Sequence, residues 1–170
     1  MFLIPNWLNS LFTFPGVVLH EASHEFFCWL FGVKVHKVVY FQFGSETAGY
    51  VNHDVPNRIS QLFWISIGPL VGNTVIAILL AHYGFFSAPT NISKVLSLWM
   101  AFAVAMHAFP SNADGKNILD ETREVRKNGG SILYYLFYPF FWLLQLANFL
   151  KFFWFDVGYA VVLIWVGFLI

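Results

Sequence analysis

The sequence predicts an all-α polytopic membrane protein that crosses the bilayer about five times and carries a small interfacial β-hairpin. Of its 170 residues, 58 % are apolar and only 11 % are charged, which is far from the average for a soluble domain. The apolar residues fall into five runs separated by polar segments, and about 20 mostly apolar residues are enough for a helix to span a bilayer. Lipid is therefore the expected environment.

The five runs define the expected membrane spans. They cover residues 7–33, 59–83, 94–109, 131–150 and 152–170. Pro15-Gly16 divides the first run, because proline is well suited to the first turn of a helix, so residues 5–14 should form an entry segment. The first run carries no Lys or Arg before it and is not expected to be a cleaved signal peptide. The last two spans should form a tight hairpin around Lys151.

Residues 34–58 differ from the rest, because apolar and polar residues alternate there around a glycine-containing turn at 44–49. This pattern predicts a β-hairpin. An open sheet cannot cross a bilayer, so the hairpin should lie at the interface or in a protein-lined cavity. We expect one membrane domain over residues 1–170. It divides into a core at 7–118 that includes the hairpin, an amphipathic loop at 119–130 and a C-terminal helical hairpin at 131–170.

Positive charge is unevenly divided between the two sides of the predicted membrane. Lys94 and Lys151 lie on one side. The other side holds Lys34, Lys37, Arg58, Lys116, Arg123, Arg126 and Lys127. The positive-inside rule then places the N-terminus outside and the C-terminus in the cytoplasm. The net charge is zero and no basic run is dense, so no nucleic-acid partner is expected.

HEASH, residues 20–24, is the most informative motif, since ionisable groups within an apolar run are costly and usually functional. In a helix, positions i and i+4 share a face, so His20 and His24 can offer ring nitrogens to one metal ion. Glu21 then lies close enough to polarise a metal-bound water. This is the zinc-metalloprotease signature, and Zn²⁺ is the expected cofactor.

Catalytic zinc usually takes three protein ligands and keeps one position for water, so another segment should supply the third ligand. The first and third spans run in the same direction, which brings the ends carrying His24 and Asp114 to the same side. Asp114 is the predicted ligand, although Asp114-Gly115 is also a common helix cap or turn. The alternative is a glutamate of the following polar segment, Glu121 or Glu124.

Three motifs together resemble the site-2 protease family of intramembrane zinc metalloproteases. They are HEASH at 20–24, GPLVGN at 68–73, and Pro110 with Asp114-Gly115 in HAFPSNADG at 107–115. The resemblance covers about residues 14–118 and implies a three-helix metalloprotease core. It implies that His20, His24 and Asp114 bind Zn²⁺, that Glu21 is the catalytic base, and that the substrates are membrane-spanning or membrane-embedded segments of membrane proteins.

The sequence departs from the family pattern at His107, where the family has asparagine, and in a Pro110-to-Asp114 spacing that is one residue shorter. His107 could donate a hydrogen bond in place of asparagine, or could compete with Asp114 for the metal. The candidates for orienting a substrate are His107, Asn73 and Asn112. Asn73 serves equally well in plain helix packing.

Three side chains near these motifs have more ordinary interpretations. Cys28 follows His24 by one helical turn and is expected to be an apolar filler. Glu25 could pair with a basic side chain from a loop or orient a ligand. His36 is expected to be a solvated loop histidine. A non-catalytic membrane protein that binds zinc for structure or regulation is the remaining alternative function.

Overall fold

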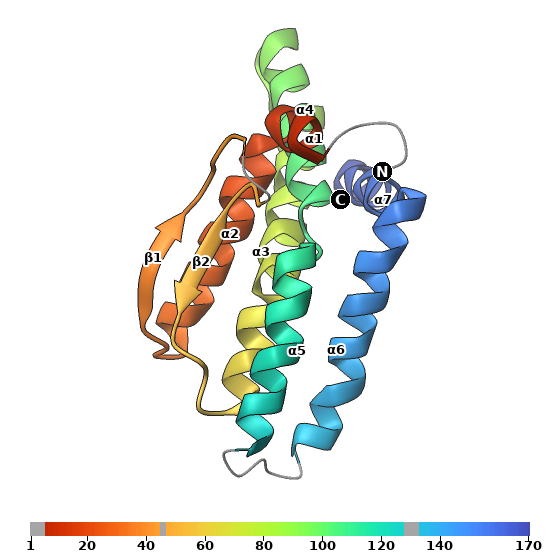
Figure 1. Cartoon of the computed structure of the whole chain (residues 1–170). Coiled ribbons are helices and arrows are strands. Elements are labelled where there is room, and N and C mark those ends of the chain that lie inside the picture. Colours follow the sequence, from red (N-terminus) through yellow and green to blue (C-terminus); the bar gives the residue numbers. More distant parts are fainter. Residues whose placement is uncertain (1–5, 45–46, 128–132) are drawn as a thin grey trace.

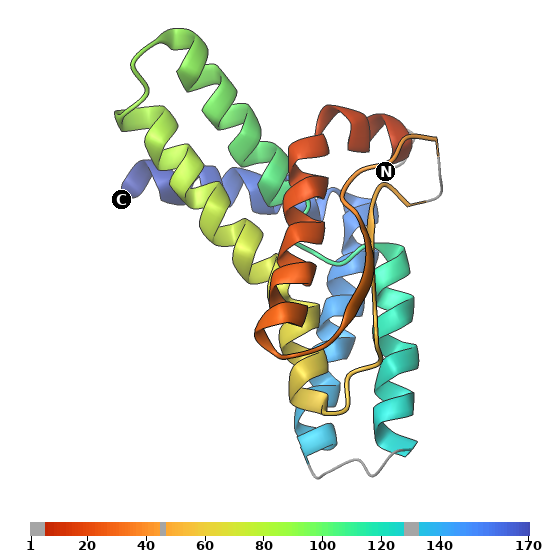
Figure 2. The ribbon, with the colours of Figure 1, turned by 90° about the vertical axis from the view of Figure 1, so that its left-hand side faces the viewer.

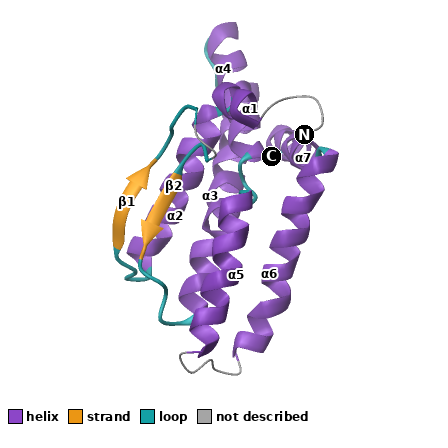
Figure 3. Ribbon diagram, in the orientation of Figure 1, coloured by secondary structure: helices purple, strands orange, loops and turns teal. Residues whose placement is uncertain are grey.

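The computed structural model describes residues 6–44, 47–127 and 133–170, and the described chain is mostly helical with one two-stranded antiparallel sheet (Figures 1 and 3). The helices are α1 (Asn6–Phe12), α2 (Phe14–Leu30), α3 (Ile59–Phe86), α4 (Asn91–Met106), α5 (Asn112–Lys127), α6 (Leu133–Leu150), the 3₁₀ turn η1 (Lys151–Phe153) and α7 (Phe155–Leu169). The strands are β1 (Val35–Val39) and β2 (Tyr50–His53).

The first apolar run forms two helices, because the chain bends at Thr13 between α1 and α2. Pro15 lies in the first turn of α2, where its missing N–H costs no helical hydrogen bond. The Asn9 carbonyl at the end of α1 accepts from both the N–H of Thr13, at 3.0 Å, and its hydroxyl, at 2.7 Å. The predicted entry segment is thus a short helix set against the start of α2.

The core of the molecule is the packing of α2, α3 and α4, and small residues allow it. A Cβ on Gly16 of α2 would lie 2.0 Å from the Ala103 carbonyl oxygen of α4. A Cβ on Gly72 of α3 would lie 2.6 Å from Oγ of Ser23 on α2. The glycines of α2 and α3 therefore allow the close approach of these helices.

The predicted β-hairpin is also confirmed, and it packs against α2 (Figure 2). Val38 pairs with Val51 and Val39 with Tyr50, and the register shifts between Val35 and Lys37. The Tyr40 hydroxyl donates a hydrogen bond to the Glu25 carboxylate, which fastens the hairpin to α2. The partner of Glu25 is therefore a tyrosine hydroxyl and not the basic side chain that was expected.

Helix α5 packs along α3 and α6 (Figure 1). Its Ile118, Thr122 and Val125 are buried, while the ion pair between Asp120 and Arg123 on its other face is exposed. Ile118 and Val125 join a core cluster with residues of α3 and α6, namely Ile59, Leu62, Phe141 and Leu144. The amphipathic segment is thus a bundle helix that begins at Asn112; residues 128–130 of the predicted segment lie outside the described residues.

The expected tight hairpin around Lys151 is wrong. After η1 the backbone passes through Trp154 at φ 65°, and α7 leaves in a different direction from α6 (Figures 1 and 2). Helix α7 packs on α3 and α4 instead. The Tyr159 hydroxyl lies 2.6 Å from the Thr74 hydroxyl of α3, and its ring packs edge-on against Phe109. These contacts with distant residues determine where α7 lies.

Five separate membrane spans are not supported. Among the described residues one helix, α3 with 28 residues, is long and apolar enough to cross a bilayer. The apolar helices α4 and α7 contain 16 and 15 residues, and α2 has 17. At 1.5 Å per residue each is roughly 22–26 Å long, which is less than a hydrocarbon core of about 30 Å. The run at 7–33 is longer than α2 because it also contains most of α1, and the run at 152–170 is longer than α7 because it begins before that helix; the run at 94–109 is itself no longer than α4.

Candidate metal centre

Three side chains that are distant in sequence converge between α2 and the start of α5. His20 and His24 lie one turn apart on α2, with ring centroids 4.8 Å apart, and Asp114 lies in the first turn of α5. One ligand atom from each of the three lies within 4.8 Å of the other two. Among the described residues this is the one group of at least three His, Cys, Asp or Glu side chains arranged so that it could hold a metal ion.

Both histidines are anchored through Nδ1 to backbone carbonyl oxygens. Nδ1 of His20 lies 2.6 Å from the His107 carbonyl, and Nδ1 of His24 lies 3.0 Å from the Ile65 carbonyl. A carbonyl oxygen can only accept, so each Nδ1 carries a proton, and each ring in its neutral form presents an Nε2 lone pair. The lone pairs are directed to the Asp114 carboxylate, at 3.2 Å from His20 and 3.9 Å from His24.

This arrangement fits a divalent cation. Nε2 of His24 and Oε2 of Glu21 are buried without a hydrogen-bond partner within the described part of the chain, which is costly for polar atoms. At His20, a lone pair faces a carboxylate, a pairing that a proton or a cation must bridge. A tetrahedral zinc ion with bonds of about 2.0–2.1 Å separates neighbouring ligand atoms by roughly 3.3 Å. The measured distances of 3.2 and 3.9 Å are close to that separation.

Asp114 also caps its helix, so both of its interpretations hold at once. The Ser111 backbone N–H donates to Oδ2 of Asp114 at 2.8 Å, and the Asp114 N–H donates to the Ser111 hydroxyl at 3.1 Å. This reciprocal pair is a capping box at the start of α5. The Ser111 hydroxyl also donates to Oδ2. Oδ1 takes neither of these hydrogen bonds and is directed toward His24. The cap therefore fixes the carboxylate that completes the cluster.

Two of the residues expected to orient a substrate, His107 and Asn73, make structural contacts instead. The His107 side chain turns away from the cluster, with Nε2 2.7 Å from the Thr13 hydroxyl, so the carbonyl of His107 acts at the site instead. Asn73 is fully buried, and its amide nitrogen lies 3.1 Å from that carbonyl and 3.2 Å from the Val104 carbonyl. Asn73 thus packs helices together. The side chain of Asn112 lies outside the described residues.

The alternative third ligands lie elsewhere. Glu121 follows Asp114 by two turns of α5 and is not part of the ligand cluster, and Glu124 is exposed. Burial raises the pKa of Glu121 to about 7. Cys28 is fully buried one turn beyond His24, among Val33 and Ile65, as expected of an apolar filler.

Two supporting residues were missed by sequence reasoning. Lys151 donates from Nζ to the Phe109 and Pro110 carbonyls at 2.8 Å, which holds the loop that leads to Asp114. A lysine between two apolar runs was a visible signal, but nothing local indicated its partners. Gly49 lies so close to Glu21 that a Cβ would be 2.8 Å from the Glu21 Cγ, so the hairpin covers this carboxylate. That contact depends on the tertiary fold.

Comparisons with protein-family models, with curated proteins and with solved structures gave no match. The similarity to site-2 proteases therefore stays a prediction that rests on the three motifs.

Proposed function

We propose that this protein is a membrane-embedded zinc metallopeptidase whose metal is held by His20, His24 and Asp114. The observation that carries the proposal is the convergence of the three ligand side chains near Oε2 of Glu21, which is buried and has no hydrogen-bond partner among the described residues. Two oriented imidazoles and a carboxylate are a ligand set typical of catalytic zinc, which keeps a further position open. Buried polar atoms without partners are otherwise expensive, so a site of this kind implies an occupant.

Zn²⁺ bound to these ligands would act as a Lewis acid and would lower the pKa of a coordinated water. Glu21 follows His20 directly, and its carboxylate is the group suited to accept a proton from the attacking water. The same carboxylate then delivers that proton to the leaving amine. The Nδ1 hydrogen bonds of His20 and His24 hold both rings in the tautomer that ligation needs.

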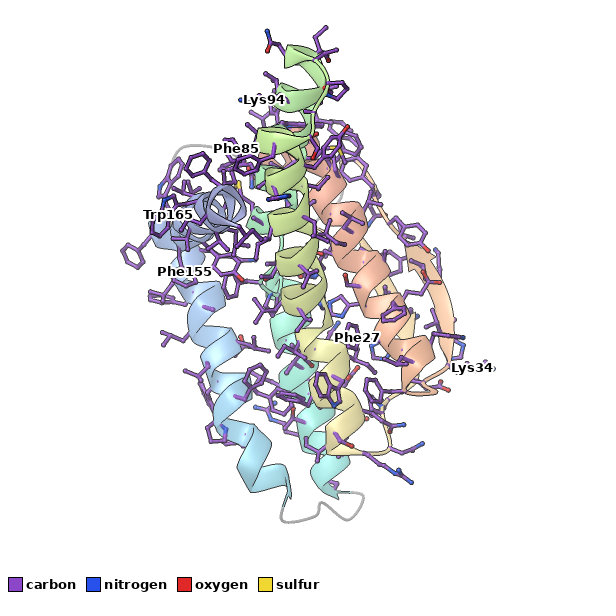
Figure 4. All side chains as sticks on the ribbon, turned by 180° about the vertical axis from the view of Figure 1, so that it is seen from behind. Phe27, Lys34, Phe85, Lys94, Phe155 and Trp165 are labelled. Atoms are coloured by element: carbon purple, nitrogen blue, oxygen red, sulfur yellow. The ribbon has the colours of Figure 1, made fainter. Side chains whose placement is uncertain are left out.

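The membrane setting is supported by large apolar side chains exposed over several helices. Trp29 of α2, Leu79 of α3 and Trp165 of α7 each leave more than half of their surface exposed, at 74 %, 59 % and 60 %. A soluble monomer rarely exposes apolar surface on this scale. Lys34 and Lys94 lie toward opposite ends of the molecule, with labelled aromatic side chains between them (Figure 4). We propose that α3 crosses the bilayer, with its N-terminal end on the cytoplasmic side.

A peptide segment of a membrane protein is the substrate class that this setting favours. Helical segments hide their amide bonds, so the scissile segment has to be extended at the site. The hairpin β1–β2 lies over Glu21 at Gly49, and a strand edge there is suited to hold an extended peptide by strand addition.

The test uses the full chain purified in detergent, with zinc measured by mass spectrometry and cleavage measured on a membrane-embedded reporter peptide. We expect one zinc per chain and turnover in the wild type. Glu21→Gln should keep the zinc and lose turnover by about 10²-fold or more, and Asp114→Ala should lose the zinc. The matched control is Glu25→Gln, whose carboxylate bonds to the hairpin instead.

Full turnover in Glu21→Gln with zinc bound would remove the general-base role. Zinc binding without turnover in the wild type would favour a structural or regulatory zinc site. Zinc loss in Glu121→Gln but not in Asp114→Ala would assign the third ligand to the other carboxylate.

A further inference from the structure

Pro69 lies inside α3, where it removes one backbone hydrogen bond. In an α-helix the N–H of residue i donates to the carbonyl of residue i−4, so residue 69 would normally bond to the Ile65 carbonyl. Proline has no N–H, and the carbonyl four residues earlier is left without its helical donor. Helix α3 nevertheless continues through this position from Ile59 to Phe86.

The carbonyl that Pro69 leaves free is the one that His24 uses. Nδ1 of His24 lies 3.0 Å from the Ile65 oxygen, and both residues are buried, at 8 % and 2 % exposed. The Gly68 backbone beside the proline approaches α2 closely, since a Cβ there would lie 2.6 Å from the Phe27 ring. Helix α3 is therefore close enough to α2 for this carbonyl to reach an imidazole.

His20 is also anchored by a backbone carbonyl, in this case at the end of α4. Nδ1 of His20 bonds to the carbonyl of His107, the residue that follows the last turn of α4. The last carbonyls of a helix have no intrahelical donor. Each imidazole of α2 thus bonds to a carbonyl that has no helical N–H donor. For His20 this carbonyl lies at the end of α4, and for His24 it lies within α3.

We propose that Pro69 is a positioning residue for the metal site: by withholding an N–H from the Ile65 carbonyl, it reserves that oxygen for Nδ1–H of His24. His24 is then held as the Nδ1–H tautomer with its Nε2 lone pair toward Asp114. An alanine at position 69 would supply the missing N–H, and the helix would compete with His24 for one oxygen. The expected effect on zinc binding rests on the proposed metal site, whereas the hydrogen bond between His24 and the Ile65 carbonyl does not require a metal.

The experiment compares wild type, Pro69→Ala and Pro139→Ala in detergent micelles. Pro139 also lies inside a helix, α6, and serves as the matched control for removing a helix-interior proline. The first measurement is the histidine tautomer in metal-free protein, from two-bond ¹H–¹⁵N NMR correlations at high pH, with His24 assigned through His24→Gln. The second is zinc affinity, from competition with a chromogenic chelator.

In the wild type and in Pro139→Ala we expect His24 as the Nδ1–H tautomer, with equal zinc affinity. In Pro69→Ala we expect Nε2–H to become populated and zinc affinity to fall about 10- to 100-fold, as for other groups that orient a metal-bound histidine. An Nε2–H tautomer in the wild type, or an unchanged tautomer and affinity in Pro69→Ala, would overturn the inference.

The two proposals fail separately. If no form binds zinc, the metallopeptidase proposal fails, whereas the tautomer of metal-free His24 still decides the role of Pro69.

Discussion

Replacing Asn73 by Asp should destabilise the protein more than replacing it by Ala, although Asp has nearly the same shape. The Asn73 amide nitrogen lies 3.1, 3.2 and 3.4 Å from the carbonyls of His107, Val104 and Gly16. Those carbonyls belong to α2 and to the end of α4, so one fully buried side chain on α3 ties three helices together.

The magnitude follows from the hydrogen bonds. The amide has two N–H groups, each worth about 1 kcal/mol net, and truncation also leaves a small cavity, so Asn73→Ala should cost about 2–4 kcal/mol. Asn73→Asp replaces the donor by an oxygen that faces three carbonyls. An ionised carboxylate there would be a buried charge without a donor, whereas its protonated form could still donate one hydrogen bond. The penalty is then smallest below pH ~4, where the carboxyl is also protonated in the unfolded chain, and grows as the pH rises.

The assay is thermal and denaturant unfolding in detergent at pH 4 and pH 8, followed by circular dichroism. We expect Asn73→Asp to lose more than Asn73→Ala at pH 8, and to recover part of the loss at pH 4. The control, Asn91→Asp, makes the same chemical change at an exposed position and should stay within about 0.5 kcal/mol of wild type. A Tm for Asn73→Asp at pH 8 equal to that of wild type would refute the donor role of the amide.

Three further predictions follow from packing, burial and metal linkage. Gly16→Ala should cost about 2 kcal/mol or more, because its Cβ would lie 2.0 Å from the Ala103 carbonyl, whereas Gly158→Ala has open space and should be neutral or slightly stabilising in unfolding assays. Burial raises the pKa of Glu121 from 4.5 to about 7, so its cost is absent below pH 4.5 and complete above pH 7. Glu121→Gln should therefore raise stability by about 1–2 kcal/mol at pH 8 and leave it unchanged at pH 4; equal effects at both pH values would contradict this. Removing zinc with a chelator should lower Tm, and adding zinc at 100 times its Kd should restore about 2.7 kcal/mol; an unchanged Tm would argue against a metal site at the cluster.

Much of the local structure could be predicted from the sequence because it depends on neighbouring residues. The alternating pattern in 34–58 predicts the hairpin, and the spacing of His20 and His24 places both rings on one face of a helix. The helix lengths were less predictable, because the first apolar run contains two helices, α1 and α2, and the last run begins before α7. A hydropathy pattern therefore overestimates how many helices are long enough to cross a bilayer.

The partners of the site residues were harder to predict. His107 was assigned a role through its side chain, yet the structure uses its carbonyl, which any residue at that position would supply. Lys151 and Gly49 support the loop and the hairpin from distant parts of the chain, and neither carries a motif.

The amino-acid sequence by itself determined the apolar character of the chain, the hairpin and the pair of imidazoles on one helical face, because composition and helical periodicity are local properties. Only the tertiary structure decided that Asp114 and not Glu121 reaches those imidazoles, that α7 leaves α6 to pack on α3 and α4, and that the carbonyl freed by Pro69 holds His24. These choices depend on which helix surfaces pack together, and close packing between distant segments has no signature in the spacing of residues along the chain.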